Sequence, residues 1–234
     1  MNANSSTLPS TLHHENTEKT SSSCYAVNWT EDGRVLCAIN TGVEVRSNCL
    51  EIENTILLPN HTFTFSAKIV GDNLYTHATS EEDKKYFFYA GSLEQPIQRV
   101  IHSVGHETPT KITHLSVNKN HLASIDLVNK VVKIFSTMKH EHILDISLAE
   151  MKHPYSVHII SDGVLITEFF GDQLCKYGIS PSSGKLWTCE GLVYPTGIAT
   201  DESGFIYVAS HNTPKTYIIS PNGEFSFSYT KRLL

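Results

Sequence analysis

The sequence predicts an all-β fold in which one four-stranded sheet recurs about five times around a common centre. Short apolar and β-branched runs alternate with Gly, Asn, Asp, Pro and Ser from Cys24 onward, and no long helical periodicity interrupts them. Two-residue turns recur every 40 to 47 residues, and each is followed by the same order of runs. A period of this length with four strands in each repeat is typical of the β-propeller.

The turns that set the period each separate two apolar runs: Asp32-Gly33, Asp72-Asn73, Lys119-Asn120, Asp162-Gly163 and Ser203-Gly204. The run after each turn fits a strand buried on both faces, at residues 35–39, 74–76, 122–125, 164–167 and 205–209. A more polar third strand is predicted at 43–46, 85–89, 131–135, 173–177 and 216–219. Outer strands are clearest at 97–101, 143–146 and 225–229.

These small sheets need one another, because a single twisted sheet cannot bury both of its faces. Radial packing lets neighbouring sheets cover each other and leaves only short edges. Five blades could close a ring, and they could also form an incomplete six-bladed ring.

The first 23 residues differ in composition from the rest of the chain. Ser, Thr, Asn, Glu and Lys dominate there, and the large apolar residues are limited to Leu8 and Leu12. So few apolar side chains cannot offset the entropy lost on ordering. We therefore expect a disordered polar tail or linker at 1–23 and the propeller at 24–234.

Charge and cysteine content exclude several classes of function. The formal net charge is −6 and the isoelectric point is near 6.1, so the overall field repels phosphate backbones. The five cysteines contain no CxxC pair, which disfavours a zinc module or a disulfide framework. No segment has the length and apolarity of a membrane span or a secretory leader. These features predict a cytoplasmic protein without a membrane partner.

The segment from Pro195 to Ala209 reads PTGIATDESGFIYVA. It resembles the NHL repeat, in which Pro-x-Gly-Ile-Ala-Val-Asp precedes a Gly turn and an aliphatic-Tyr-Val-Ala strand. Residues 153–168 match the same pattern more loosely, with Tyr155-Ser156 where Gly is usual. The loop Ser210-His211-Asn212 is similar to the family's Asp-Ser-x-Asn loop, but Lys215 stands where an Arg is usual.

The resemblance implies the C-terminal propeller of a tripartite-motif-like protein. Propellers of this family recruit proteins or RNA, while an N-terminal RING and B-box carry the ubiquitin-ligase activity. This chain lacks the Cys/His pattern of those zinc modules. The resemblance therefore implies a recruitment module without ligase activity of its own.

In a propeller we expect a partner to meet the loops between second and third strands and the linkers that enter each blade. Aromatic side chains with polar neighbours, which are typical of binding hot spots, fall in these segments. The predicted partner-binding residues are Tyr155, Phe169, Phe170, Tyr194, His153, His211 and Lys215. The alternative interpretation is that the aromatic rings pack between neighbouring blades.

Each group of residues that could bind a metal or act in catalysis also has an ordinary structural interpretation, which is favoured. His140 and His142 could share a strand face, but the pair falls near a predicted turn and lacks further ligands. His13 and His14 lie in the polar tail. A calcium-dependent lactonase of the gluconolactonase type would use oxygen ligands after second strands, for which the candidates are Asp126, Glu168 and Asn212. Ordinary polar loop residues are the favoured interpretation of these three.

The sequence thus predicts a non-catalytic scaffold that binds a protein partner and has no catalytic residues, metal, cofactor or small-molecule substrate. No Gly-x-Ser-x-Gly motif is present. RNA binding is the first alternative, although the basic clusters at Lys130, Lys133, Lys215 and Lys231-Arg232 have few interleaved aromatic residues. The calcium-dependent lactonase is the second.

Overall fold

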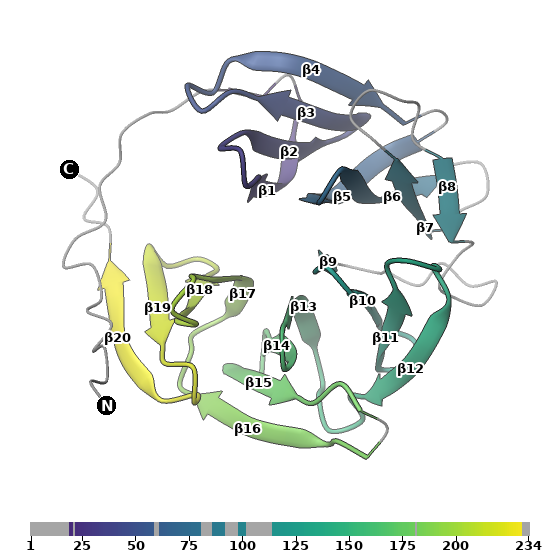
Figure 1. The fold of residues 1–234 in the computed structure, drawn as a ribbon. Coiled ribbons are helices and arrows are strands. Elements are labelled where there is room, and N and C mark those ends of the chain that lie inside the picture. The colour runs from purple at the N-terminus through teal and green to yellow at the C-terminus, as the bar shows by residue number, and fades with distance from the viewer. Residues whose placement is uncertain are drawn as a thin grey trace, which may run out of the picture.

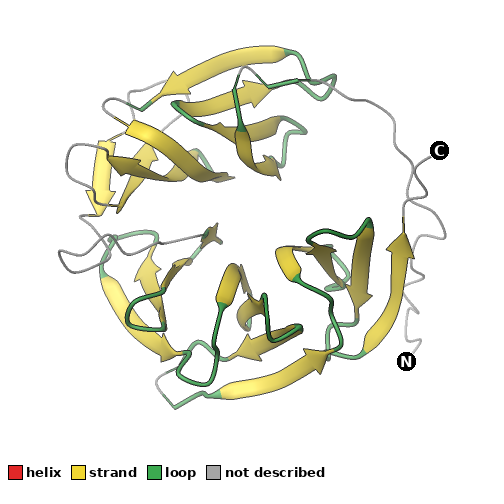
Figure 2. Ribbon diagram, turned by 180° about the vertical axis from the view of Figure 1, so that it is seen from behind, coloured by secondary structure: helices red, strands yellow, loops and turns green. Residues whose placement is uncertain are grey.

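Five antiparallel sheets of four consecutive strands lie around a common centre, with the first strand of each sheet innermost (Figure 1). The protein is therefore an all-β propeller of five four-stranded blades, as predicted. The computed structural model describes residues 19–20, 22–58, 61–80, 86–91, 98–101, 114–180 and 182–230. Regular structure in these residues consists of strands, joined by turns and loops (Figure 2).

Each blade is built from four strands in sequence order. The first blade contains β1 (Cys24–Trp29), β2 (Val35–Ile39), β3 (Gly42–Arg46) and β4 (Ile52–Leu57). The second contains β5 (His61–Val70), β6 (Asn73–Ser80), β7 (Tyr86–Gly91) and β8 (Gln98–Ile101). The third contains β9 (Leu115–Val117), β10 (His121–Asp126), β11 (Val131–Ser136) and β12 (His142–Ser147).

The last two blades follow the same order. The fourth contains β13 (Pro154–Ile160), β14 (Gly163–Glu168), β15 (Gln173–Tyr177) and β16 (Lys185–Glu190). The fifth contains β17 (Pro195–Thr200), β18 (Ile206–Ser210), β19 (Lys215–Ile219) and β20 (Phe225–Thr230). The predicted strands agree with these to within a few residues. The largest difference is β6, which was predicted at 74–76 and has eight residues. The prediction was too short because it followed the apolar residues, whereas β6 also contains polar ones.

The second strands of the third and fourth blades lie between two apolar layers, as the sequence predicts, whereas in β18 Tyr207 is half-buried and Ala209 is exposed. All residues of β2 and β14 are buried, whereas most of the outer strand β4 is exposed. The turn before β18 shows how local sequence sets a hairpin: Gly204 has a φ of +83°, which favours glycine. Asp201 closes this turn by accepting the Phe205 N–H at 2.9 Å.

Apolar side chains from facing blades form the cores between the blades. Between the first and second blades, Leu36, Ala38 and Val43 pack with Ala67 and Leu74. Comparable clusters lie between the second and third, third and fourth, and fourth and fifth blades. Each blade is therefore stabilised by its neighbours.

Polar side chains on or next to the first two strands of a blade also join neighbouring blades. Asn28 donates to the Ala67 carbonyl at 2.7 Å, and Asn118 donates to the Ile160 carbonyl at 3.2 Å. Thr167 donates to the Thr196 carbonyl at 2.9 Å. These bonds satisfy backbone carbonyls at positions where two sheets meet.

The first and fifth blades differ from the other neighbours. Extensive strand contact joins each successive pair of blades along the chain, but the described strands β17–β20 make no comparable contact with β1–β4. The ring is open between these two blades (Figures 1 and 2). One face of the first blade therefore has no blade beside it.

The predicted tail at 1–23 lies mostly outside the described residues, which begin at Lys19 and omit residue 21. His13, His14 and the basic pair Lys231-Arg232 also lie outside them. In the described part of the chain, no helix has the length and apolar character needed to cross a membrane.

Candidate functional site

Six of the seven predicted binding residues lie together at one end of the fourth and fifth blades. We call this set the aromatic surface: Tyr155, Phe169, Phe170, Tyr194, His153 and His211. They come from the linker before β13, from β13 itself, from the β14–β15 loop, from the linker before β17, and from the β18–β19 loop. The sequence analysis predicts that a partner binds at this end of the blades.

Phe169 is the centre of the aromatic surface. Its ring centroid lies 5.5 Å from that of Tyr155, 5.2 Å from Tyr194, 5.6 Å from His211 and 4.9 Å from Phe170. These distances lie within the range of attractive aromatic pairs. One ring thus connects side chains from two blades.

Phe170 forms the outer part of the surface. It stands nearly perpendicular to His153 and to Tyr194, at interplanar angles of 79° and 89°. Its exposed fraction is 63 %, against 38 % for Tyr194 and 36 % for Tyr155. Packing between blades therefore accounts for only part of each ring, and a substantial aromatic area faces outward.

Buried Glu168 holds the loop that carries the two phenylalanines. Its carboxylate accepts the backbone N–H of Lys152 at 2.5 Å and that of His153 at 3.4 Å, and it also accepts a hydrogen bond from the Gln173 side chain. A Cβ atom on Gly171 would lie 2.5 Å from the Glu168 Cδ. The loop therefore needs glycine at 171 so that it can pass over this carboxylate.

The backbone at Tyr194 is in a conformation that non-glycine residues seldom adopt. Its φ is +44°, and its N–H donates to Asp172 Oδ1 at 3.0 Å. Its carbonyl accepts the His211 N–H at 2.9 Å. Such a conformation costs of order 1–3 kcal/mol and clusters at functional sites, and here it fixes the ring beside Phe169.

β-Bulges lie beside the site in both blades. The register of β13 with β14 shifts between Pro154 and Val157, and that of β17 with β18 shifts between Pro195 and Ile198. A bulge turns a side chain away from the regular alternation of a strand. In β13 the bulge spans Tyr155, whose ring is exposed.

His114 extends the site into the third blade, and the sequence analysis missed it. Its ring centroid lies 5.2 Å from that of Tyr155, and burial lowers its pKa to about 4. The imidazole is therefore neutral at neutral pH. The available signal was its position, since His114 directly precedes β9 as His153 directly precedes β13.

Lys215 is the predicted residue that the structure leaves apart from the aromatic surface. It is exposed at the first position of β19. Among the interactions described for this part of the chain, no ion pair or ring contact joins it to the six.

The three candidate calcium ligands lie on separate blades. Asp126 and Glu168 are buried, which corrects the interpretation of these two as ordinary loop residues, because each is the last residue of its second strand. Asp126 Oδ1 accepts the N–H groups of Val128 and Asn129 at 3.1 Å, so it stabilises its own turn. Asn212 is exposed and has a φ of +61°.

The histidine pair at 140 and 142 is engaged in other contacts. The His142 ring nitrogen lies 2.7 Å from Asp145 Oδ1, and the His140 ring packs edge-on against Tyr75. Across the residues that the structure describes, no group of three or more His, Cys, Asp or Glu side chains could hold a metal ion.

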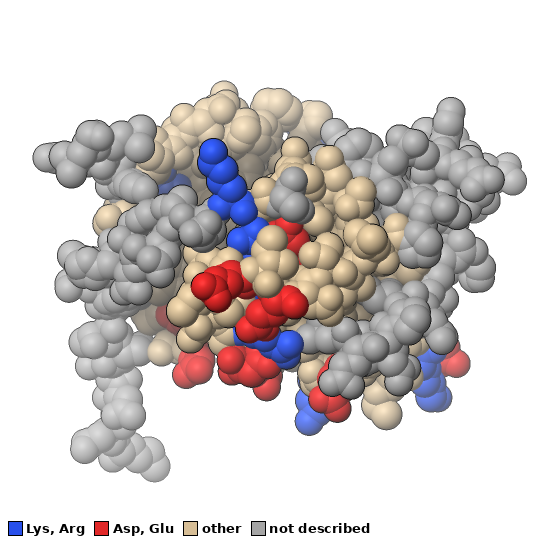
Figure 3. Space-filling view, turned by 90° about the horizontal axis from the view of Figure 1, so that it is seen from above, with Lys and Arg blue, Asp and Glu red and all other residues tan. Residues whose placement is uncertain are grey.

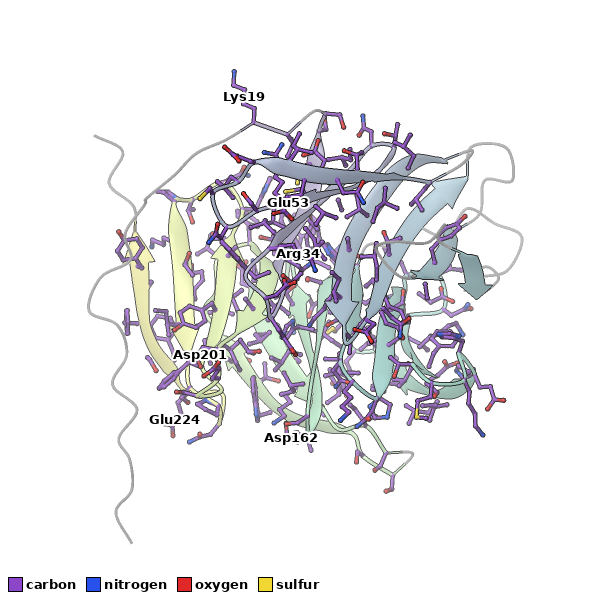
Figure 4. The ribbon with its side chains drawn as sticks, turned by 45° about the horizontal axis from the view of Figure 1, so that its top comes forward. Lys19, Arg34, Glu53, Asp162, Asp201 and Glu224 are labelled. Atoms are coloured by element: carbon purple, nitrogen blue, oxygen red, sulfur yellow. The ribbon has the colours of Figure 1, made fainter. Side chains whose placement is uncertain are left out.

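Acidic side chains mark the end of the blades opposite the aromatic surface. Asp162, Asp201 and Glu224, in the turns β13–β14, β17–β18 and β19–β20, lie along one edge of the molecule (Figure 4). On the side of the ring that carries the first blade, basic and acidic side chains are interspersed (Figure 3). This distribution differs from the basic stripe that tracks a nucleic-acid backbone.

Comparison with known proteins supports the fold. A family of β-propeller repeats matches residues 190–211, which overlap the segment that resembles the NHL repeat. The comparison with curated proteins finds no similar sequence.

Solved structures of similar fold include proteins of different kinds. A protein of unknown function from Bacteroides caccae is 11 % identical with a TM-score of 0.70, and the match covers 91 % of this chain and 83 % of that one. Virginiamycin B lyase from Staphylococcus aureus is 12 % identical with a TM-score of 0.66, over 88 % of this chain and 69 % of the lyase. At these identities the likeness shows the fold alone, which is that of a β-propeller.

Proposed function

We propose that this propeller is a non-catalytic binding module, the protein-recruiting part of a cytoplasmic tripartite-motif-like protein, and that its partner binds at the aromatic surface. One observation carries the proposal: aromatic and histidine side chains from five separate segments form continuous ring contacts, and Phe170, Tyr194 and Tyr155 remain partly exposed. The resemblance to the NHL repeat supports the family context. The five free thiols support a reducing compartment.

The energetics suit a binding hot spot. Full burial of a Phe side chain contributes about 1.5–3 kcal/mol, and Phe170 still has most of its surface to bury. The rings of Phe169 and Tyr194 already pack against each other, and Asp172 holds the backbone of Tyr194. A partner therefore orders few side chains on binding, which lowers the entropic cost.

The test uses a random dodecapeptide library displayed on phage and selected against the full chain. Peptides enriched on the wild-type protein are measured against Phe170→Ser. The matched control is Met138→Ser, because Met138 is 87 % exposed in the β11–β12 turn at the opposite end of the blades.

Loss of a hot-spot ring costs about 2 kcal/mol or more. We therefore expect affinity to fall at least about 30-fold in Phe170→Ser and to stay within about twofold in the control. Equal binding by both variants would place the interaction elsewhere. No enrichment, together with salt-dependent binding of mixed-sequence RNA that Phe170→Ser weakens, would favour the RNA alternative.

The non-catalytic part of the proposal has its own test. One solved structure of similar fold is that of a catalytically inactive histidine-to-alanine variant of virginiamycin B lyase with quinupristin. We expect no turnover of quinupristin by this chain, measured by mass spectrometry. Turnover that disappears in His153→Ala or His211→Ala would contradict the proposal.

A further inference from the structure

The first blade has one face that no other blade covers. Leu36 and Ala38 of β2 point toward the second blade and pack with Ala67. Because side chains alternate along a strand, Val35, Cys37 and Ile39 lie on the other face of the sheet. The first blade borders the opening between the first and fifth blades on this side (Figure 1).

This uncovered face is nevertheless shielded from water over much of its area. Val35, Cys37 and Ile39 are each exposed by 5 % or less and form a small apolar cluster with Leu50. On β3 the side chains of Glu44 and Arg46 share this face and are buried as an ion pair at 2.7 Å. Parts of the chain other than a neighbouring blade therefore shield these side chains.

Two described residues of the segment before β1, Lys19 and Ser22, form hydrogen bonds with the first blade. Arg46 Nη2 donates to the Lys19 carbonyl at 2.8 Å, and the Asn40 N–H donates to Ser22 Oγ at 3.3 Å. The Lys19 side chain points away from the first blade (Figure 4). The segment thus bonds the blade through a backbone carbonyl and a hydroxyl.

Arg46 is suited to binding the segment before β1 because other residues of the first blade already hold its guanidinium in place. It donates to Glu44 Oε2 through Nε at 2.9 Å and through Nη2 at 2.7 Å, and its Nη1 donates to the Leu50 carbonyl at 2.7 Å. The Lys19 carbonyl completes this set. A planar guanidinium held in this way loses little further entropy when it binds another acceptor.

We propose that the segment before β1, which Arg46 anchors at the Lys19 carbonyl, caps the uncovered face of the first blade in the place that a neighbouring blade would take. Lys19, Thr20, Ser22 and Ser23 are all polar, which suits the outer surface of a terminal cap in a repeat protein.

The cap keeps the open ring from associating with itself. Val27 and Trp29 of β1, which lie opposite Cys37 and Val35 in the sheet, are exposed by 57 % and 63 %. Removal of the cap would join them to Val35, Cys37 and Ile39 in one apolar face. Exposed faces and edges of this kind promote association between chains.

The experiment compares the full chain, a chain lacking residues 2–23, and Arg46→Lys in the full chain. All three carry Cys24→Ser and Cys49→Ser, so that Cys37 reports on the face while Cys175 and Cys189 stay buried. The readouts are the rate of Cys37 modification by a thiol reagent and the molar mass from light scattering.

We expect the truncated chain to react at least tenfold faster at Cys37 and to self-associate, and a peptide of residues 2–23 to restore protection when added. Arg46→Lys retains the charge pair with Glu44 but loses the fork that reaches Lys19, so its rate should be intermediate. Unchanged reactivity and a monomeric mass in the truncated chain would overturn the proposal. Should that chain not fold, an unchanged Cys37 rate in folded Arg46→Lys would overturn it equally.

Discussion

Thr167→Val isolates one of the polar bonds between blades next to the aromatic surface. The Thr167 hydroxyl donates to the Thr196 carbonyl at 2.9 Å and accepts the Ser156 N–H at 3.1 Å. Thr167 and Ser156 are both buried. Valine has nearly the same shape, so the substitution removes both hydrogen bonds while leaving the packing almost unchanged.

The expected cost follows from the two lost bonds. Each contributes about 1 kcal/mol net, and a buried N–H left without an acceptor costs more than that. We expect the free energy of unfolding to fall by about 2–3 kcal/mol. For a chain of this length, each kcal/mol lowers Tm by about 2–4 °C, so Tm should fall by about 4–12 °C.

Urea and thermal unfolding followed by circular dichroism provide the measurement. Thr55→Val is the matched control, because Thr55 lies on the exposed outer strand β4 and surface substitutions of this kind stay within about 0.5 kcal/mol. A loss for Thr167→Val no larger than that of the control would refute the reasoning. The hydroxyl would then have no part in joining the fourth and fifth blades.

Two further perturbations test packing and titration. Gly223→Ala should lower the free energy of unfolding in urea by about 2 kcal/mol or more. The new Cβ would lie 2.6 Å from the Trp187 ring, and the φ of residue 223 is +87°. Gly184→Ala is the control, because open space surrounds that position, and equal losses in the two variants would contradict the prediction. Burial lowers the pKa of His114 and of His158 to about 4, below the usual value near 6.5. The unfolded chain therefore binds more protons, and stability should fall as the pH drops from about 6.5 toward 4, by about 2 kcal/mol per histidine between pH 7 and pH 5. A flat profile in urea titrations over that range would refute the assignment.

The fold could be predicted because each blade repeats the same local pattern of a turn followed by an apolar strand. Turns such as Asp32-Gly33 and Ser203-Gly204 mark the hairpins, and the fully apolar runs that follow them become β2 and β18. Period and burial agree where a second strand has a blade on each side, as β14 does. The open side could not be predicted, since sequence period alone does not show whether the last blade meets the first.

The candidate site could be predicted in part. Tyr155, Phe169, Phe170 and Tyr194 could be assigned to one end of the ring because each is an aromatic residue in a segment that reaches that end. His114 was missed because its contact with Tyr155 crosses from the third blade to the fourth. Sequence period gives the place of a residue within its blade but not the neighbours it meets across blades.

The supporting residues were harder to identify. The sequence pattern places Glu168 in an ordinary polar loop. In the structure its side chain is buried and accepts hydrogen bonds from the backbone N–H groups of Lys152 and His153. The positive φ of Tyr194 depends on bonds to Asp172 and His211, which come from different loops. Only the folded arrangement of the blades brings these groups together.

Hydrogen exchange of the full chain with and without a selected peptide tests the binding surface most directly. Slower exchange should appear at the amides of residues 191–194 and 211–213, which carry Tyr194 and His211, while the turn at 201–204 at the other end of the same blade stays unchanged. Protection of 201–204 without any change at 191–194 would contradict the claim that partners bind at the aromatic surface.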